Sequence, residues 1–146
     1  MPKSLRGRAL VVVAGSMLFA TVAAAEPNMT EGNWEIKGEM KMEGLPFQMP
    51  PVPVSYSQCL TKKDLVPEQK EKNGDCTTES QKVEGNNVTW VTHCVDKKGS
   101  KIDGTGTMTY KGTTFEGTIH NVMTDTKGGK VESRLNMNGK RIGDCK

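Results

Sequence analysis

The stretch that decides the fold is CTTESQKVEGNNVTWVTHC, residues 76–94. From Val88 to Cys94 an apolar or small side chain recurs at every second position, which is the period of a β-strand with one buried face. Gly85 and Asn86 lie just before this run, and glycine supplies the positive φ that a tight hairpin turn needs. The stretch therefore predicts an antiparallel hairpin with a cysteine near the outer end of each arm.

The same alternation recurs through the rest of the chain after residue 25. No alanine follows Ala25, whereas threonine and glycine are abundant, and this composition disfavours helices. We therefore predict an all-β fold, an antiparallel meander of about eight strands that forms a small barrel or a curved half-barrel with one solvated face. The expected strands are residues 34–42, 52–60, 76–84, 88–95, 101–110, 114–123, 130–137 and 140–145.

Three predicted turns share one pattern of an apolar residue, a polar residue, glycine, two polar residues and an apolar residue. They are VEGNNV at 83–88, YKGTTF at 110–115 and MNGKRI at 137–142. Asn-Gly is the strongest short hairpin signal, so a turn at Asn138-Gly139 is expected to separate the last two strands. Common turn chemistry and an internal duplication both explain the repeated pattern.

Residues 1–25 have the order of a secretory signal peptide. Three basic residues, ending at Arg8, precede an apolar run from Ala9 to Ala20, and Ala23 and Ala25 are the small residues expected before a cleavage site. A transmembrane anchor is the alternative, but the run is shorter than the roughly 20 residues that span a bilayer. We expect cleavage after Ala25, a single β domain over residues 26–146, a periplasmic or secreted location, and no stable insertion in a membrane.

The basic residues of this first segment account for the whole formal charge of +3, because residues 1–25 contain no acid. The remainder of the chain is therefore charge-balanced. A bulk electrostatic attraction to nucleic acid is excluded, and no nucleic-acid partner is expected.

The four cysteines all lie after residue 25. An even number of cysteines in an exported chain predicts two disulfides. Hairpin registers around Gly85 place Cys76 opposite Cys94, within the span of a disulfide, which leaves Cys59 to bond Cys145. The pairing of Cys59 with Cys76, and of Cys94 with Cys145, remains the alternative. If successive strands run alternately up and down, all four cysteines lie on one rim, and the Cys59–Cys145 bond helps to close the sheet.

Several short motifs follow one another along the chain in a recognisable order and spacing. They are Gly32-Asn33-Trp34-Glu35, the Met- and Pro-rich stretch from Met40 to Pro53, Gln58-Cys59-Leu60-Thr61, Asp75-Cys76, Cys94 and Arg141-Ile142-Gly143-Asp144-Cys145. Together they resemble the DUF3617 family (domain of unknown function 3617), small exported proteins of Gram-negative bacteria, and the resemblance covers essentially all of residues 26–146. It implies a periplasmic or secreted β-rich domain with no assigned activity, so no catalytic residue can be transferred from the family.

The sequence contains no set of residues typical of catalysis. His93 and His120 fall on the opposite parity to the apolar positions, which predicts surface-facing side chains. Oxidised cysteines provide no thiol nucleophile, and no glycine-rich phosphate loop is present. We therefore expect neither enzymatic activity nor a cofactor.

The concave side of the curved sheet is the leading candidate for a binding site, because small barrels can hold one apolar ligand. Gly104 and Gly106 interrupt an apolar stripe and are expected to leave room for a small apolar molecule or a peptide. A lid is expected at the rim opposite the cysteines. Its candidate residues are Phe47, Met49, Pro50 and Pro51.

The sequence is compatible with two other functions. Met40, Met42 and Met49 offer thioether sulfurs, which suit a soft ion such as Cu(I), although methionine more often fills gaps in a core. No other metal ligands are predicted. Alternatively, the domain has a purely structural role and interacts with another envelope protein.

Overall fold

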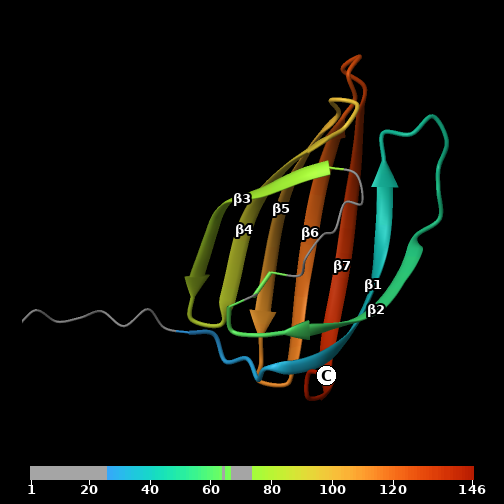
Figure 1. The fold of residues 1–146 in the computed structure, drawn as a ribbon. Coiled ribbons are helices and arrows are strands. Elements are labelled where there is room, and N and C mark those ends of the chain that lie inside the picture. The colour runs from blue at the N-terminus through green and yellow to red at the C-terminus, as the bar shows by residue number, and fades with distance from the viewer. Residues whose placement is uncertain (1–25, 64, 67–73) are drawn as a thin grey trace, which may run out of the picture.

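The structure, a computed structural model, describes residues 26–63, 65–66 and 74–146, so the predicted signal peptide lies outside the described residues. All neighbouring strands are antiparallel, and they form one sheet in the order β2-β1-β7-β6-β5-β4-β3 (Figure 1). None of the described residues belongs to a helix long and apolar enough to cross a membrane. The predicted all-β antiparallel fold is confirmed. The strands of the described ranges are β1 (Gly32–Glu43), β2 (Val52–Leu60), β3 (Gly74–Glu84), β4 (Asn87–Asp96), β5 (Lys101–Tyr110), β6 (Thr114–Thr124) and β7 (Lys130–Gly143).

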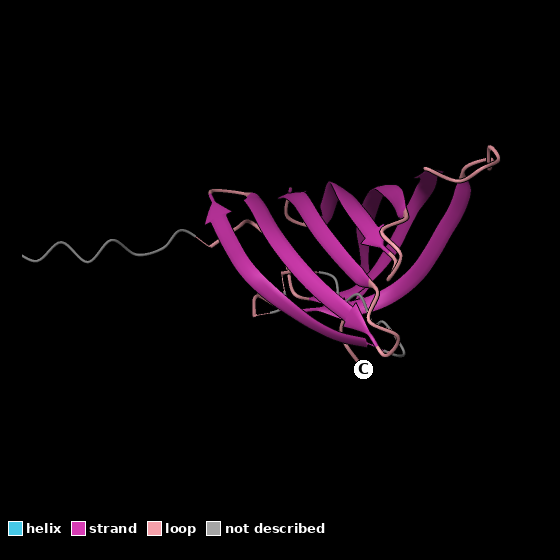
Figure 2. Ribbon diagram, turned by 90° about the horizontal axis from the view of Figure 1, so that it is seen from above, coloured by secondary structure: helices cyan, strands magenta, loops and turns pink. Residues whose placement is uncertain are grey.

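The sheet is curved and open. Figure 2 shows it bent into a half-barrel, and β2 and β3 are its two edges. The alternation of side chains explains its two faces: on β5, Met108 and Tyr110 are buried whereas Thr105 and Thr107 are exposed. The buried set faces the concave side, where the hydrophobic core lies, and the convex side is polar.

The sheet has one strand fewer than the eight expected, because β7 runs from Lys130 to Gly143 without a turn. Gly85 and Gly112 have the positive φ of turn residues, 58° and 77°, but Gly139 does not. Gly139 instead pairs with Phe115 of β6, and a Cβ on Gly139 would overlap the Phe115 ring. The predicted turn at Asn138-Gly139 is therefore wrong, since this glycine makes space for an aromatic ring.

This reading of Gly139 predicts that Gly139→Ala lowers the free energy of unfolding by about 1–3 kcal/mol, the usual cost of overpacking a core. Gly143→Ala is the matched control on the same strand, because no atom lies within 4 Å of its would-be Cβ, and it should leave stability nearly unchanged. Urea denaturation measures both changes. Equal stabilities of the two variants would contradict the placement of Phe115 over Gly139.

The Cys76–Cys94 disulfide joins β3 to β4, as the hairpin register predicted. A bulge between Thr78 and Ser80 shifts the register of this pair of strands by one residue. Without the shift, Cys76 would face Val95 instead of Cys94. The bulge therefore aligns the two sulfurs on the concave side of the sheet.

The Cys59–Cys145 disulfide lies at the opposite end of the sheet. Cys59 is near the end of β2 and Cys145 follows β7, whereas Cys76 is near the start of β3 and Cys94 near the end of β4. The prediction that all four cysteines share one rim is wrong, because the connection from β2 to β3 joins opposite ends and opposite edges of the sheet. Consecutive strands consequently do not always run in opposite directions, because β2 and β3 run the same way.

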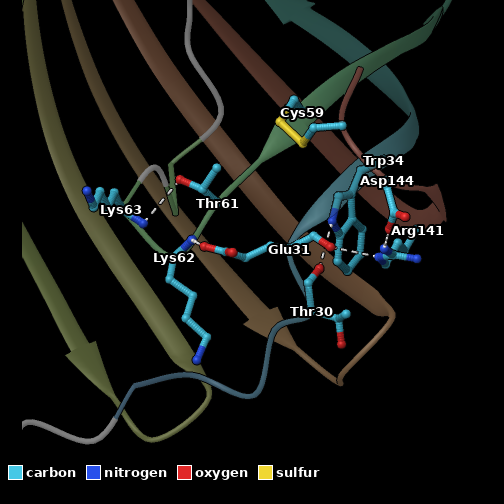
Figure 3. The surroundings of a disulfide bond; sticks show 10 residues. Thr30, Glu31, Trp34, Cys59, Thr61, Lys62, Lys63, Arg141 and Asp144 are labelled. Carbon is cyan, nitrogen blue, oxygen red and sulfur yellow. Dashed lines mark hydrogen bonds and ion pairs between the residues drawn. A yellow bond between two sulfur atoms is a disulfide. The ribbon is translucent and has the colours of Figure 1, made fainter.

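The Cys59–Cys145 bond fastens β2 to the end of the chain across β1 and does not join the two edges. Figure 3 shows polar contacts that hold the segment before β1 at the Cys59–Cys145 end of the sheet. Arg141 Nε donates a hydrogen bond to the Glu31 carbonyl at 2.8 Å, and the backbone N–H of Lys62 donates to Glu31 Oε1 at 2.8 Å. The disulfide attaches the residues after β7 to β2. The two hydrogen bonds attach the segment before β1 to β7 and to the residues that follow β2.

Candidate ligand-binding site

The concave face has two halves of different character. The half toward the Cys59–Cys145 end, here called the filled half, is covered by Met29 from the N-terminal segment, by Leu60 at the end of β2 and by Leu65 from the segment that follows β2. Its other buried members come from the sheet itself. They are Trp34, Ile36, Val88, Met108, Tyr110, Phe115 and Met137.

Three aromatic rings form the centre of the filled half. The Trp34 ring centroid lies 5.5 Å from that of Phe115 and 6.2 Å from that of Tyr110, and the Trp34–Tyr110 contact is edge-on. The Tyr110 hydroxyl donates a hydrogen bond to the Leu65 carbonyl at 2.7 Å, and burial raises the pKa of the Tyr110 phenol. These contacts make the described side chains of the filled half a packed core.

The half of the concave face toward the Cys76–Cys94 end, here called the open half, is only partly covered by the described residues. Ile102, Met123 and Val131 form one row across β5, β6 and β7, and Met123 is 43% exposed. The side chains of this half carry no charge. Its members are Met40, Met42, Thr92, Ile102, Gly104, Asn121, Met123, Val131, Ser133 and Leu135.

The glycines of this face do not leave the free space expected from the sequence. The Trp90 ring lies over Gly106, where a Cβ would overlap it. Over Gly104, the side chains of Thr92 and Asn121 converge from the neighbouring strands, and a Cβ would lie 2.7 Å from Asn121 Oδ1. Both glycines therefore accommodate neighbouring side chains.

Asn121 is the one buried side-chain acceptor without a hydrogen-bond partner in the part of the chain that the structure describes. Its Oδ1 is buried, and no hydrogen bond to Oδ1 is formed. Asn121 pairs with Gly104 on one side and Ser133 on the other. Buried polar groups are normally satisfied, so an unpaired one in a native protein calls for an explanation.

A cavity of about 420 Å³ lies at the end of β1 and within the connection to β2. We call it the hairpin cavity. Apolar residues and polar or charged residues both line it, and the apolar ones are in the majority. They are Lys41, Met42, Glu43, Gly44, Leu45, Phe47, Gln48, Met49 and Pro51.

The hairpin cavity contains three of the four predicted lid residues, Phe47, Met49 and Pro51, whereas Pro50 is exposed and does not line it. Phe47 is 62% exposed. The connection lies at the same end of the sheet as the Cys76–Cys94 bond, because β1 ends and β3 begins there. Its predicted position opposite all the cysteines is therefore wrong.

The three methionines proposed for a soft metal occupy two places. Met42 and Met49 both line the hairpin cavity. Met40 pairs with Val52 and Leu135 on the sheet and is half-buried. The structure thus brings two of the three thioethers to one cavity.

Both histidines lie on the convex face and contact acids there. His93 Nδ1 lies 2.6 Å from Asp103 Oδ1, and His120 Nε2 lies 3.0 Å from Glu132 Oε2. Across the described residues, no group of three or more His, Cys, Asp or Glu side chains is arranged to hold a metal ion.

Asn121 was missed at the level of sequence, although a signal was present. It lies at the same parity as Ile119 and Met123, so it is a polar residue on an apolar stripe. The pattern could not show that its Oδ1 lacks a hydrogen bond. Which residues lie beside Asn121 on β5 and β7 depends on the strand register, and the pattern within one strand does not contain it.

The fold and site define an open antiparallel half-barrel with two disulfides and an apolar concave face. The chain belongs to the DUF3617 family, whose description is "protein of unknown function" and whose model matches residues 29–145. Neither a curated protein nor a solved structure matches the chain. Two disulfides are typical of proteins that work outside the reducing cytoplasm.

Proposed function

We propose that this protein is a non-catalytic binding protein of the periplasm or the extracellular medium, and that it holds a small apolar ligand or an apolar peptide side chain. The ligand lies on the open half of the concave face and extends into the hairpin cavity. Export is supported by the signal-peptide pattern of residues 1–25 and by the disulfides.

The observation that carries the proposal is the position of Met42. This residue pairs with Ser133 on the open half and also lines the hairpin cavity, so the two surfaces are continuous. Gly44 adds to this continuity, because its would-be Cβ lies 3.4 Å from the Cα of Val131. A cavity of about 420 Å³ falls within the range of small-molecule sites, roughly 300–1,000 Å³.

The chemistry of the open half supports binding, because none of its described side chains can act as a general acid or base. The open half carries uncharged side chains, and the histidines lie on the other face of the sheet in contact with acids. General acid–base catalysis requires a titratable group within hydrogen-bond reach of the reacting atom. An apolar ligand, in contrast, gains about 25 cal/mol for each Å² of apolar surface removed from water.

Titration with N-phenyl-1-naphthylamine, an uncharged apolar fluorophore, tests this function. We expect a saturable rise in emission with the oxidised protein, and at least about 10-fold weaker binding by Met123→Lys and by Phe47→Ser, because a charge or a lost aromatic contact costs more than about 1.4 kcal/mol. Both side chains are well exposed, so both variants should fold. Thr105→Lys, exposed on the convex face, should bind like the wild type.

Equal affinities for all four proteins, or no saturable rise at all, would contradict binding on the concave face. That result would favour the purely structural role in the envelope.

Soft-metal binding is the second candidate, favoured by the shared position of Met42 and Met49 in the hairpin cavity. Thioethers are suitable ligands for Cu(I). A Cu(I) competition titration of the oxidised protein, compared with Met42→Leu/Met49→Leu, separates the two functions. The leucines keep the cavity apolar, so the double variant should lose Cu(I) but retain the fluorophore.

A further inference from the structure

The acceptor oxygen of the Asn121 carboxamide receives no hydrogen bond from any described residue. This oxygen, Oδ1, is buried without a partner, although Ser133 of the adjacent strand β7, and Thr92 of β4 beyond Gly104, lie in the same row of the concave face. Asparagine offers both an acceptor oxygen and a donor NH₂. An acceptor oxygen without a partner beside apolar side chains is suited to accept a hydrogen bond from a donor group that arrives with a ligand.

The surroundings of Asn121 restrict the charge of that group. From the row of Trp90 to the row of Met123, the side chains that share this face across β4 to β7 are uncharged. The acids at the ends of these strands are engaged in turns: Asp96 Oδ1 accepts hydrogen bonds from the Lys98 and Ser100 backbones, and Asp125 Oδ1 accepts them from Lys127 and Gly129. On this face of the described strands β4 to β7, an ionised ligand group would therefore find no counter-ion and would lose its hydration without compensation.

Apolar surface extends from Asn121 in two directions. Met123 and Val131 lie in the next row toward the end of the sheet. Met42 lies beyond Ser133 in the same row as Asn121 and leads into the hairpin cavity. A chain anchored at Asn121 can thus cover apolar side chains in either direction.

We propose that Asn121 is the polar anchor of the site and that the ligand is an uncharged amphiphile, whose amide N–H or hydroxyl group donates a hydrogen bond to Asn121 Oδ1 while its hydrocarbon chain lies on the open half. This inference rests on the proposed function and specifies the chemical class of its ligand.

The test is displacement of N-phenyl-1-naphthylamine from the oxidised protein by decanamide and by decanoate at neutral pH. The two compounds have the same chain length, but decanoate is ionised. We expect decanamide to bind about 10-fold more tightly, in line with the value of one satisfied hydrogen bond and the cost of an unpaired charge. Asn121→Leu should abolish this preference, so that decanamide and decanoate bind within about twofold of each other.

Asn136→Leu is the matched control, because Asn136 lies on the convex side of β7 and is exposed. It should keep the preference for decanamide. Equal or tighter binding of decanoate by the wild type, or an unchanged preference in Asn121→Leu, would overturn the anchor while leaving apolar binding intact. No binding of the fluorophore would instead overturn the proposed function. If the wild-type protein were a dimer and Met123→Lys a monomer, a second copy of the chain would cover the open half, and the amphiphile proposal would be overturned.

Discussion

Replacing Cys59 and Cys145 together by alanine is expected to lower the free energy of unfolding by about 4–5 kcal/mol. The bond joins residues separated by 86 positions, and in the chain-entropy model the constraint on the unfolded chain grows with loop length. The total stability of a domain is only about 5–15 kcal/mol, so this single bond supplies a large share. Urea denaturation of the oxidised wild type and the double variant measures the change.

The Cys76→Ala/Cys94→Ala variant is the control, because it removes a disulfide of the same chemistry with a sequence separation of 18. Its expected cost is about 3 kcal/mol. If the short-loop variant were the less stable of the two, the major stabilising role assigned to the Cys59–Cys145 bond would be wrong.

Trp34→Ala is expected to cost about 3–5 kcal/mol, the usual loss for truncating a large aromatic side chain in a core. The Trp34 side chain is fully buried, it contacts the rings of Tyr110 and Phe115, and its Nε1 donates a hydrogen bond to the Thr30 carbonyl at 3.2 Å. Truncation would remove all of these contacts. Urea denaturation again provides the measurement.

Phe47→Ser is a suitable control for Trp34→Ala, since it also truncates an aromatic residue but one that is 62% exposed. It should change stability by no more than about 0.5 kcal/mol. A cost below about 1 kcal/mol for Trp34→Ala would mean that the filled half is not tightly packed.

The strands were largely predictable because each is half-buried, so side-chain alternation marks it directly. The error at Asn138-Gly139 shows the limit of this approach. A local turn signal cannot be distinguished from a glycine that a distant aromatic ring requires, and here Phe115 occupies the space beside Gly139. Tertiary packing therefore overrode turn propensity.

The disulfide pairing was predictable where a short hairpin constrained it, between Cys76 and Cys94. The positions of the two bonds in the sheet were not predictable, because they depend on strand order. The first strand pairs with the last, and alternation within each strand contains no information on that choice.

The candidate site was predictable only in part. Phe47, Met49 and Pro51 were recognised from their composition and do line a cavity with Met42. The role inferred for Asn121 depends on the register of three strands and on a missing hydrogen bond. Those properties arise only from the folded arrangement.

Native mass spectrometry of the oxidised wild-type protein, purified from the cells that produce it, tests ligand binding on the concave face most directly. We expect a population with an added mass that corresponds to an uncharged amphiphile, and we expect Met123→Lys, prepared in parallel, to lack it. The same mass retained by Met123→Lys, or only the ligand-free mass in the wild type, would contradict a ligand on the open half.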